Sequence, residues 1–461
     1  MRNINRQTIL ILQICLCFQV LASCEEMIEV DTPSNQIVRA QIFEDVQTAN
    51  SALSGLYASL RDQSVIAGNN YGAGAILGSY VDDLDCYYND SNEYQDIYLN
   101  SQHSTNNLIE RIWNLSYQQI YFCNSIIYGV ENSISLTTEQ IAPIKAEALF
   151  VRSLLYYYLQ QLYGDIPYTT STDYEYNKDL NKLSEEQLLN QLESDLHEVV
   201  LLMEDSYREP QRIYPNRKAA ELLLSQIYLS QNKWYEAEIL GKSILQSNLY
   251  QLVSDVSQVF QNSGPHILWQ LRPQNYGDST HEASFYYFID SAPHAYALSQ
   301  DLINSFSPND LRMQDWITSN SIGSNTWYRP TKYKNLSGTN TDEYSIVYRI
   351  EEVYFTIAEA LLKQNKSSEA LGYLNAIRER AGLAPLASSL SNEELITEYL
   401  SEKRREYFAE FGKRFFDLKR LGKLGDLSSK KPNWQEHHNL WPLPQRELLL
   451  NQHLNPQNQG Y

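Results

Sequence analysis

The sequence predicts an all-α protein built on tetratricopeptide-like helix pairs, with long loop-rich insertions between them. Apolar residues recur at three- and four-residue spacing in segments along the whole chain, as on one face of an amphipathic helix. Two segments, 218–246 and 348–382, repeat this pattern on both sides of a short polar break, as paired helices do. Between them lies a stretch, 249–342, that is dense in aromatic and turn-forming residues.

The first 43 residues are predicted to direct export and anchoring. Residues 1–23 hold two arginines and then an apolar run that is too short to span a bilayer, as in a secretory signal peptide. The run ends in LASC, which resembles the lipobox of bacterial lipoproteins, where the cysteine is acylated. We therefore expect a signal peptide over 1–23, lipidation of Cys24 and a tether over 24–43, since two lipid chains on one cysteine suffice for stable anchoring.

Residues 44–461 are expected to form one domain, because no Pro-, Ser- or Gly-rich linker divides them. Its first amphipathic segments are 44–61, 107–129, 139–163 and 184–203. Gly164 suits the C-terminal end of the third of these helices, and Ser184 begins a capping box at the start of the fourth. A tetratricopeptide-like pair over 218–230 and 234–246 follows.

Residues 65–107 are rich in Gly, Asn, Asp, Ser and Tyr and are expected to be an irregular excursion rather than core. Their glycine motif has no βαβ context, so no cofactor is expected. Their aspartates include Asp82, Asp83, Asp85 and Asp90. The EF-hand spacing is absent, so we expect solvated carboxylates; an irregular calcium site stays open as the alternative. Cys86 and Cys123 are expected to be separate thiols, and a disulfide between them stays open.

Residues 249–342 interrupt the helical pattern and contain one strand-like segment, 266–271. A ligand site is expected on loops that project from a rigid helical support, so we place it on 65–107 and 249–342. The predicted ligand-binding residues are Tyr71, Tyr87, Tyr88, Tyr276, Trp327 and Tyr328. Trp316 is a weaker candidate, because its apolar neighbours indicate a helical core position.

The C-terminal quarter is predicted to hold a helix pair over 348–382, ended by Gly382, and a third helix over 401–420. The third helix interleaves aromatic residues with arginines, lysines and glutamates. Acidic residues balance much of its positive charge, which argues against nucleic-acid binding. We expect a solvated face crossed by salt bridges.

The same segment carries a resemblance to a known family. EFGKR at 410–414 and FDLKR at 416–420 resemble the C-terminal signature of the SusD/RagB family of Bacteroidetes outer-membrane nutrient-binding lipoproteins, although many members have His in place of Lys413. The chain end, from Pro442 to Tyr461, is similar to the closing motif of that family. The acidic residues after Cys24 resemble its export signal.

The resemblance implies a SusD-like fold and a lipoprotein of the outer membrane that faces the cell exterior. It also implies that the protein captures oligosaccharides and delivers them to a TonB-dependent SusC-like transporter. RagB-like members take up peptides, so a peptide is the alternative ligand. A helical glycoside hydrolase is a third possibility.

Composition and motifs agree with a binding protein. The formal net charge of −20 argues against nucleic acid as a partner. Tyrosine is abundant, with 35 residues, and it suits packing between helices as well as polar ligands. We find no catalytic motif in its required context, and we expect no metal and no enzyme activity. The abundant acids leave a glycosidase pair open, because counting carboxylates does not exclude one.

Overall fold

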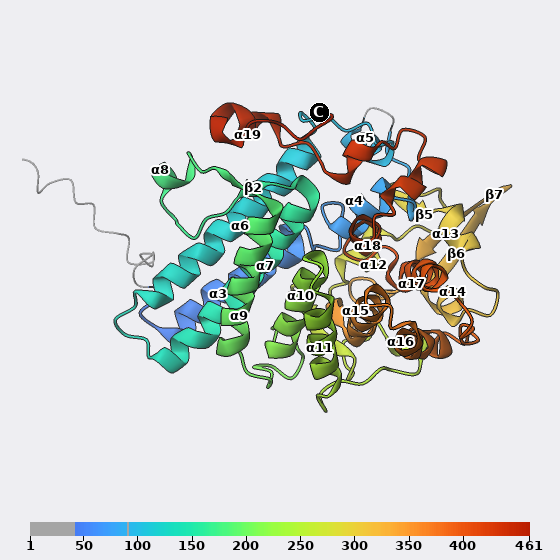
Figure 1. The fold of residues 1–461 in the computed structure, drawn as a ribbon, viewed down its shortest axis with the longest axis horizontal. Helices are drawn as coiled ribbons and strands as arrows, with labels where there is room; N and C mark the ends of the chain where they lie inside the picture. The colour runs from blue at the N-terminus through green and yellow to red at the C-terminus, as the bar shows by residue number, and fades with distance from the viewer. Residues whose placement is uncertain (1–41, 90–91) are drawn as a thin grey trace, which may run out of the picture.

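The computed structural model of the protein describes residues 42–89 and 92–461. The predicted signal peptide, Cys24 and all but the end of the tether lie outside the described residues. In the described part, helices form most of the structure and small antiparallel sheets lie at one end (Figure 1). None of its helices is long and apolar enough to cross a bilayer.

The helices of the first half lie where the sequence predicts them. The longer helices are α3 (Val46–Gln63), α6 (Asn107–Glu131), α7 (Thr138–Tyr163), α9 (Glu185–Leu202), α10 (Arg217–Ser230) and α11 (Trp234–Leu245). Gly164 ends α7 with a φ of +75°, a backbone conformation that side chains disfavour. Ser184 forms the predicted capping box, accepting from the backbone N–H of Gln187 while the Gln187 side chain accepts from Ser184. These predictions are confirmed.

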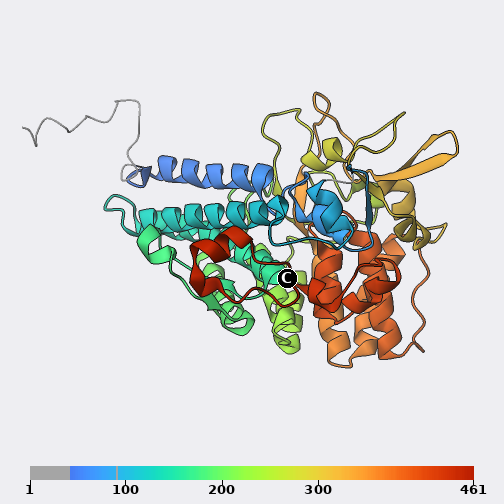
Figure 2. The same ribbon diagram turned by 90° about the horizontal axis from the view of Figure 1, so that it is seen from above.

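The helices stack in a continuous series in which each packs on the next. The order is α6, α7, α9, α10, α11, α15 (Ile350–Lys363) and α16 (Ser367–Arg380). The two tetratricopeptide-like pairs are therefore neighbours in space, and 249–342 leaves the stack and returns to it (Figure 2). Gly241 of α11 permits this contact, because a Cβ there would lie 2.6 Å from Cγ1 of Ile357.

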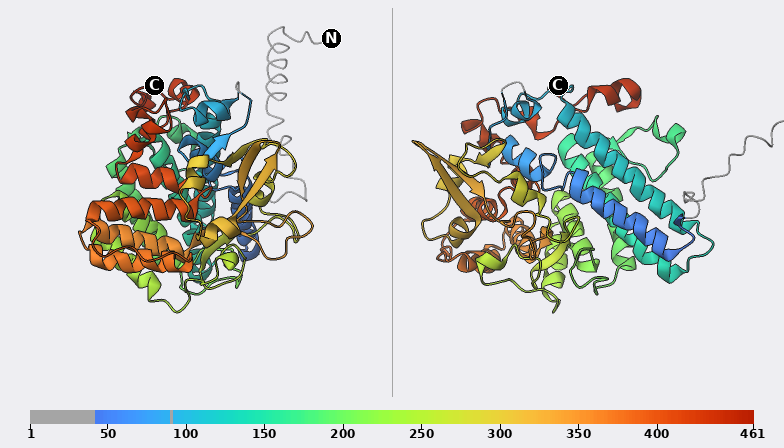
Figure 3. Two further views of the ribbon diagram at one scale, coloured as in Figure 1. Left: turned by 90° about the vertical axis from the view of Figure 1, so that its right-hand side faces the viewer. Right: turned by 180° about the vertical axis from the view of Figure 1, so that it is seen from behind.

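Helix α7 is the centre of the core. Every residue from 146 to 163 is buried, so the helix is covered on all sides, with α6 and α9 as its main neighbours. A helix of this kind shows little periodicity and depends on its surroundings. The C-terminal segment crosses the molecule to reach the early chain: the Tyr80 hydroxyl donates to the His438 carbonyl, and Lys431 donates to the Ser79 carbonyl (Figure 3).

The strands form three antiparallel sheets. A four-stranded sheet has the order β1 (Leu84–Cys86), β5 (Tyr296–Leu298), β7 (Asn325–Pro330) and β6 (Ile317–Ile322). The two small sheets pair β4 (Ile267–Leu271) with β8 (Ser345–Arg349), and β2 (Ile166–Pro167) with β3 (Lys182–Leu183). Strand β4 confirms the strand predicted at 266–271. The shorter helices are α4 (Ala73–Tyr80), α5 (Glu93–Tyr98), α8 (Tyr174–Asn177), α12 (His281–Phe285), α13 (Gln300–Asn304), α14 (Leu311–Trp316) and α19 (Gln445–Leu450).

The expectation that 65–107 lies outside the core is wrong for α4 and β1. Ile76, Leu77 and Tyr80 of α4 are at most 1 % exposed. The glycines that indicated a loop serve close packing instead. A Cβ on Gly74 would lie 2.5 Å from the carbonyl oxygen of Ala409, so glycine lets α4 approach the C-terminal segment.

The helix predicted over 401–420 is two helices, α17 (Asn392–Tyr407) and α18 (Lys413–Arg420). The break between them has left-handed backbone at Ala409, Phe411 and Gly412. The predicted solvated face is also wrong, because the charged side chains of this region are buried. The buried ones are Glu402, Lys403, Arg404, Arg405, Glu406, Glu410, Lys413 and Asp417.

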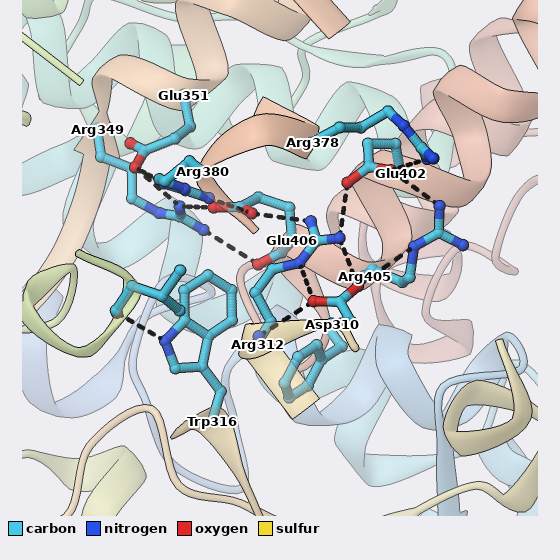
Figure 4. Close-up of polar contacts among 12 residues, drawn as sticks. Asp310, Arg312, Trp316, Arg349, Glu351, Arg378, Arg380, Glu402, Arg405 and Glu406 are labelled. Carbon is cyan, nitrogen blue, oxygen red and sulfur yellow. Dashed lines mark hydrogen bonds and ion pairs between the residues drawn. The ribbon is translucent and has the colours of Figure 1, made fainter. Parts of the chain in front are cut away.

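Glu402, Arg405 and Glu406 belong to a buried ion network with Glu406 at its centre (Figure 4). Lys403 and Lys413 pair with Glu352 instead, and Arg404 pairs with Asp82 and Asp83. The Glu406 carboxylate accepts from Arg312 at 3.1 Å and from Arg380 at 2.5 Å, and it also accepts from Arg349. All four side chains are at most 2 % exposed. Burial alone would raise the pKa of Glu406, but the three guanidinium groups hold it well below its usual range.

A second carboxylate of α17 extends the network. Glu402 lies 2.7 Å from Arg312, 3.0 Å from Arg378 and 2.9 Å from Arg405. Asp310 completes the set by accepting from Arg312 at 2.8 Å. Arg312 therefore contacts three carboxylates. These ion pairs offset the free-energy cost of moving its charge out of water.

We predict that Glu406→Gln destabilises the protein by about 3–5 kcal/mol, the cost of breaking a buried ion pair and leaving a charge uncompensated. The glutamine fits the same space but leaves three buried arginines short of one negative charge. Urea unfolding followed by circular dichroism measures the change. Glu393→Gln, at an exposed position of the same helix, should change the free energy of unfolding by no more than about 0.5 kcal/mol. Equal stability of both variants would contradict the role given to Glu406.

Candidate ligand-binding site

The six predicted aromatic residues lie on one side of the molecule. We call this surface, formed by residues 61–89 and 271–345, the loop face; Figure 2 shows much of it on the side opposite helices α15 to α18. The ends of α3 and the strands β1, β5 and β7 supply its support. The structure thus brings the two predicted loop segments to one surface.

Three of the aromatic residues lie on or beside the four-stranded sheet, where Tyr328 packs against a buried cluster and Trp327, the preceding residue of β7, points to the opposite face. Tyr87 follows β1 and its backbone N–H donates to the carbonyl of Ala295 at 2.8 Å, while Tyr328 of β7 pairs with Leu298 of β5. Burial raises the pKa of Tyr87, and the nearby Trp327 side chain opposes that shift. Tyr87 is still 37 % exposed, so the pair presents an aromatic surface to solvent.

Tyr71 and Tyr88 lie beside this pair, and each has one ring face covered by the protein. Tyr88 stacks on Tyr94 with 4.6 Å between ring centroids. The guanidinium of Arg111 lies 3.6 Å from the ring centroid of Tyr71. Burial raises the pKa of Tyr88 to about 12, which keeps its hydroxyl neutral. This leaves one face of each ring on which a ligand can stack.

Trp316 is 1 % exposed and donates to the Val256 carbonyl. It is a packing residue, as its lower ranking predicted.

Tyr276 belongs to another part of the loop face, in the segment between Gln274 and Asp278, two residues that line a cleft of about 270 Å³. Its side chain is 90 % exposed. The cleft is lined by the end of α3, the start of α12 and the loops around Pro273 and Ser337. Helix α12 joins the cleft to the aromatic surface, since Phe285 at its other end packs edge-on against Tyr296 of β5.

Asp62 organises the charged wall of the cleft. It accepts two hydrogen bonds from Arg61, at 2.7 and 2.5 Å. The Nε2 atom of His281 lies 2.9 Å from one of its carboxylate oxygens. Partial burial would raise the pKa of Asp62, but the bonds from Arg61 and His281 lower it below its usual value. The carboxylate is therefore ionised, and Arg61 and His281 both already have a partner in the protein.

Glu282 forms the floor between this cleft and a small cavity of about 20 Å³ behind it. One of its carboxyl oxygens accepts from Ser345, and the other is buried without a hydrogen-bond partner. Burial raises the pKa of Glu282. Glu282 is therefore already engaged by the protein, as Asp62 is, and Asp278 of the same cleft accepts from the Asn275 side chain at 2.8 Å.

Of the aspartates considered for calcium, Asp90 lies outside the described residues, and Asp82, Asp83 and Asp85 have partners in the protein. Asp82 accepts from Arg414 at 3.1 Å and Asp83 accepts from Arg404 at 2.8 Å; both acids are buried, so the expectation of solvated carboxylates is wrong for them. Nearby arginines lower the pKa of Asp82 to about 2 against the effect of burial. Over 42–89 and 92–461, no group of three His, Cys, Asp or Glu residues could hold a metal ion. Cys86 and Cys123 are both free thiols.

Sequence reasoning did not nominate the residues of the cleft. Asp62 and His281 are 219 residues apart, and a single aspartate after an amphipathic helix carries no signal of its own. The abundance of tyrosine in the loops did indicate the aromatic surface. Together the surface and the cleft offer flat rings beside hydroxyl, amide and imidazole groups, which suits an uncharged ligand with many hydroxyl groups.

Two family models match the chain. One, described as "Starch-binding associating with outer membrane", matches residues 29–229, and the model of the "SusD family" matches residues 311–461. The chain belongs to the SusD family. These matches confirm the family that the sequence predicted. They include residues 402–461, which carry the motifs that resemble it.

Relatives in the SusD family match over almost the whole chain. SusD-like protein P25 of Formosa agariphila is 23 % identical and SusD-like protein P2 of the same organism is 24 % identical, covering 93 % and 96 % of this chain and 94 % and 97 % of the relatives. Among solved structures, a laminarin binding SusD-like protein matches with a TM-score of 0.77 at 21 % identity, over 90 % of this chain and 99 % of that one. Surface glycan-binding protein A of Bacteroides thetaiotaomicron, in complex with laminarihexaose, matches with a TM-score of 0.75 at 18 % identity, over 89 % and 99 %. The SusD-like helical fold is confirmed.

Proposed function

We propose that this protein is a lipoprotein that captures oligosaccharides at the outer surface of the outer membrane and delivers them to a SusC-like TonB-dependent transporter. The aromatic pair of Tyr87 and Trp327, on the same loop face as the polar cleft, is the observation that carries the binding role. Sugars present apolar C–H faces ringed by hydroxyl groups, so an aromatic surface next to fixed polar groups complements them. Two proteins of the same fold, named above, are described as binding laminarin or laminarihexaose.

We propose binding without turnover. The three carboxylates of the cleft all accept hydrogen bonds within the protein: Asp62 from Arg61 and His281, Glu282 from Ser345, and Asp278 from Asn275. Product analysis by chromatography after long incubation with an oligosaccharide tests this, since an enzyme releases shorter sugars and a binding protein returns the substrate unchanged.

We expect single alanine substitutions at the six predicted aromatic residues to weaken oligosaccharide binding, with the largest losses at Tyr87, Trp327 and Tyr276. The loss of one stacked ring costs about 1–3 kcal/mol of affinity. Tyr71 and Tyr88 should lose less, because the protein already covers one face of each ring. Calorimetry with a panel of oligosaccharides that includes laminarihexaose measures the affinities.

Circular dichroism checks that these variants fold, and Tyr235→Ala serves as the matched control. Tyr235 is 61 % exposed on α11, away from the loop face, so its loss should leave affinity unchanged. If all six variants bind as the wild type does, the ligand site lies elsewhere on the scaffold.

Anchoring is predicted to depend on Cys24. The variant Cys24→Ala should yield a folded protein that is released from membranes, because the thiol that takes the lipid is gone. Fractionation of cells that lack the transporter measures the distribution, and Cys17→Ala, within the predicted signal peptide, is the control that should stay membrane-bound. A Cys24→Ala protein that stays with the outer membrane would overturn the lipoprotein assignment.

Delivery predicts a stable complex with a SusC-like transporter. We expect the two proteins to copurify from native membranes through an interface in which polar groups contribute much of the area. A tag on the C-terminus and mild detergent extraction would test this. Repeated recovery of the protein alone would count against the proposed partner.

A further inference from the structure

A second concave site lies away from the loop face, between α6, α8 and α19. Its volume is about 420 Å³, within the range of about 300–1,000 Å³ that is typical of small-ligand pockets. Helix α6 forms one wall, residues 167–180 form the second, and α19 with the residues after it forms the third. Figure 1 shows α8 and α19 beside the upper part of α6, at the end of the molecule opposite β6 and β7. We call this site the α6–α19 groove.

The walls of the α6–α19 groove are held in place by hydrogen bonds that do not need a ligand. The Tyr117 hydroxyl donates to the carbonyl of Pro167 at 2.7 Å. Asn451 donates to the Leu180 carbonyl at 2.9 Å, which joins the C-terminal wall to the second wall. A groove fixed in this way loses little conformational entropy when a ligand enters.

The rim of the groove carries apolar side chains that have no cover in the described chain. Tyr174 is 74 % exposed and Leu450 is 70 % exposed, and both line the groove from facing walls. The ring of Tyr117 packs on Trp113 with 4.8 Å between centroids, which gives the α6 wall an aromatic surface. Side-chain amides and hydroxyls alternate with these rings; they include Asn114, Thr169, Ser171 and Asn177.

The charge of the lining favours a neutral ligand. Lys178 is the one basic residue among the described lining residues, and it is paired with Glu175. Asp179 and Glu447 supply negative charge, which disfavours an acidic sugar or a peptide carboxylate. Burial and nearby Glu110 raise the pKa of Glu447.

We propose that the α6–α19 groove is a second binding site for a neutral oligosaccharide, separate from the loop face. Its rings, its fixed polar walls and its lack of an unpaired cation are the features that a short run of hexose units requires. The ligand class rests on the proposed function, whereas the position of the site rests on the groove alone. A chain long enough to leave the loop face would then have a second point of attachment, and two linked sites raise avidity without new contacts.

The test compares the double variant Tyr174→Ala/Leu450→Ala with Trp327→Ala on the loop face and with Tyr235→Ala as the exposed control. Calorimetry with laminarihexaose and maltohexaose gives affinity and stoichiometry, and hydrogen exchange with and without each sugar locates protection. For a sugar that binds the wild type, we expect protection of 167–180 and 445–454 that Trp327→Ala retains and the double variant loses. Affinity at the groove should fall about tenfold or more in the double variant.

The proposed function and the assignment of the α6–α19 groove can be overturned separately. If sugar binds and protects only the loop face, and the double variant binds as the wild type does, the groove inference is overturned while the proposed function stands. If no sugar of the panel binds the wild type, both are overturned. Protection of the groove by tryptic casein peptides, with no protection by sugars, would overturn the neutral oligosaccharide as its ligand.

Discussion

The buried carboxylate of Glu406 is the interaction on which the rest of the structure depends. Its three arginine partners come from different elements: Arg312 from α14 in the insertion, Arg349 from the end of β8, and Arg380 from the end of α16. Each would be an uncompensated buried charge without it. The insertion that carries much of the loop face is thereby fixed to the helical scaffold by ion pairs, in addition to apolar packing.

The helical scaffold could be predicted from the sequence because its signals are local. Apolar spacing, the cap at Gly164 and the capping box at Ser184 lie within single segments, and the structure reproduces them. The buried charges could not be predicted, since alternating acids and bases on a helix have the same pattern whether water or other helices surround them. Arg349 and Arg312, which pair with Glu406, lie 57 and 94 residues before it in the chain. Gly74 was misleading for a similar reason, because a glycine in a loop and a glycine at a close contact look alike in sequence.

The candidate site, too, could be predicted from the sequence only in part. Aromatic residues in polar loops could be nominated one by one, but the sheet turns the consecutive residues Trp327 and Tyr328 to opposite faces. The cleft depends on pairs such as Asp62 and His281 that only the fold brings within reach. Tyrosine count was a weak guide to binding, since several tyrosines, among them Tyr156 and Tyr163, are wholly buried with hydroxyls bonded to backbone carbonyls. The α6–α19 groove was not predicted either, because its walls come from α6, residues 167–180 and the chain end, which lie far apart in the sequence.

The late position of Glu406 in the chain imposes an order on folding. Arg312, Arg349 and Arg380 emerge first, and without their acceptor they remain hydrated, because an isolated guanidinium does not enter an apolar interior at an acceptable cost. Asp82 and Asp83 remain without their arginine partners for longer, since Arg404 and Arg414 lie more than three hundred residues after them. An unfinished chain therefore keeps its future interior open and charged, which opposes premature collapse and aggregation. The final closure then couples early and late segments in one step, as contacts of long sequence separation do.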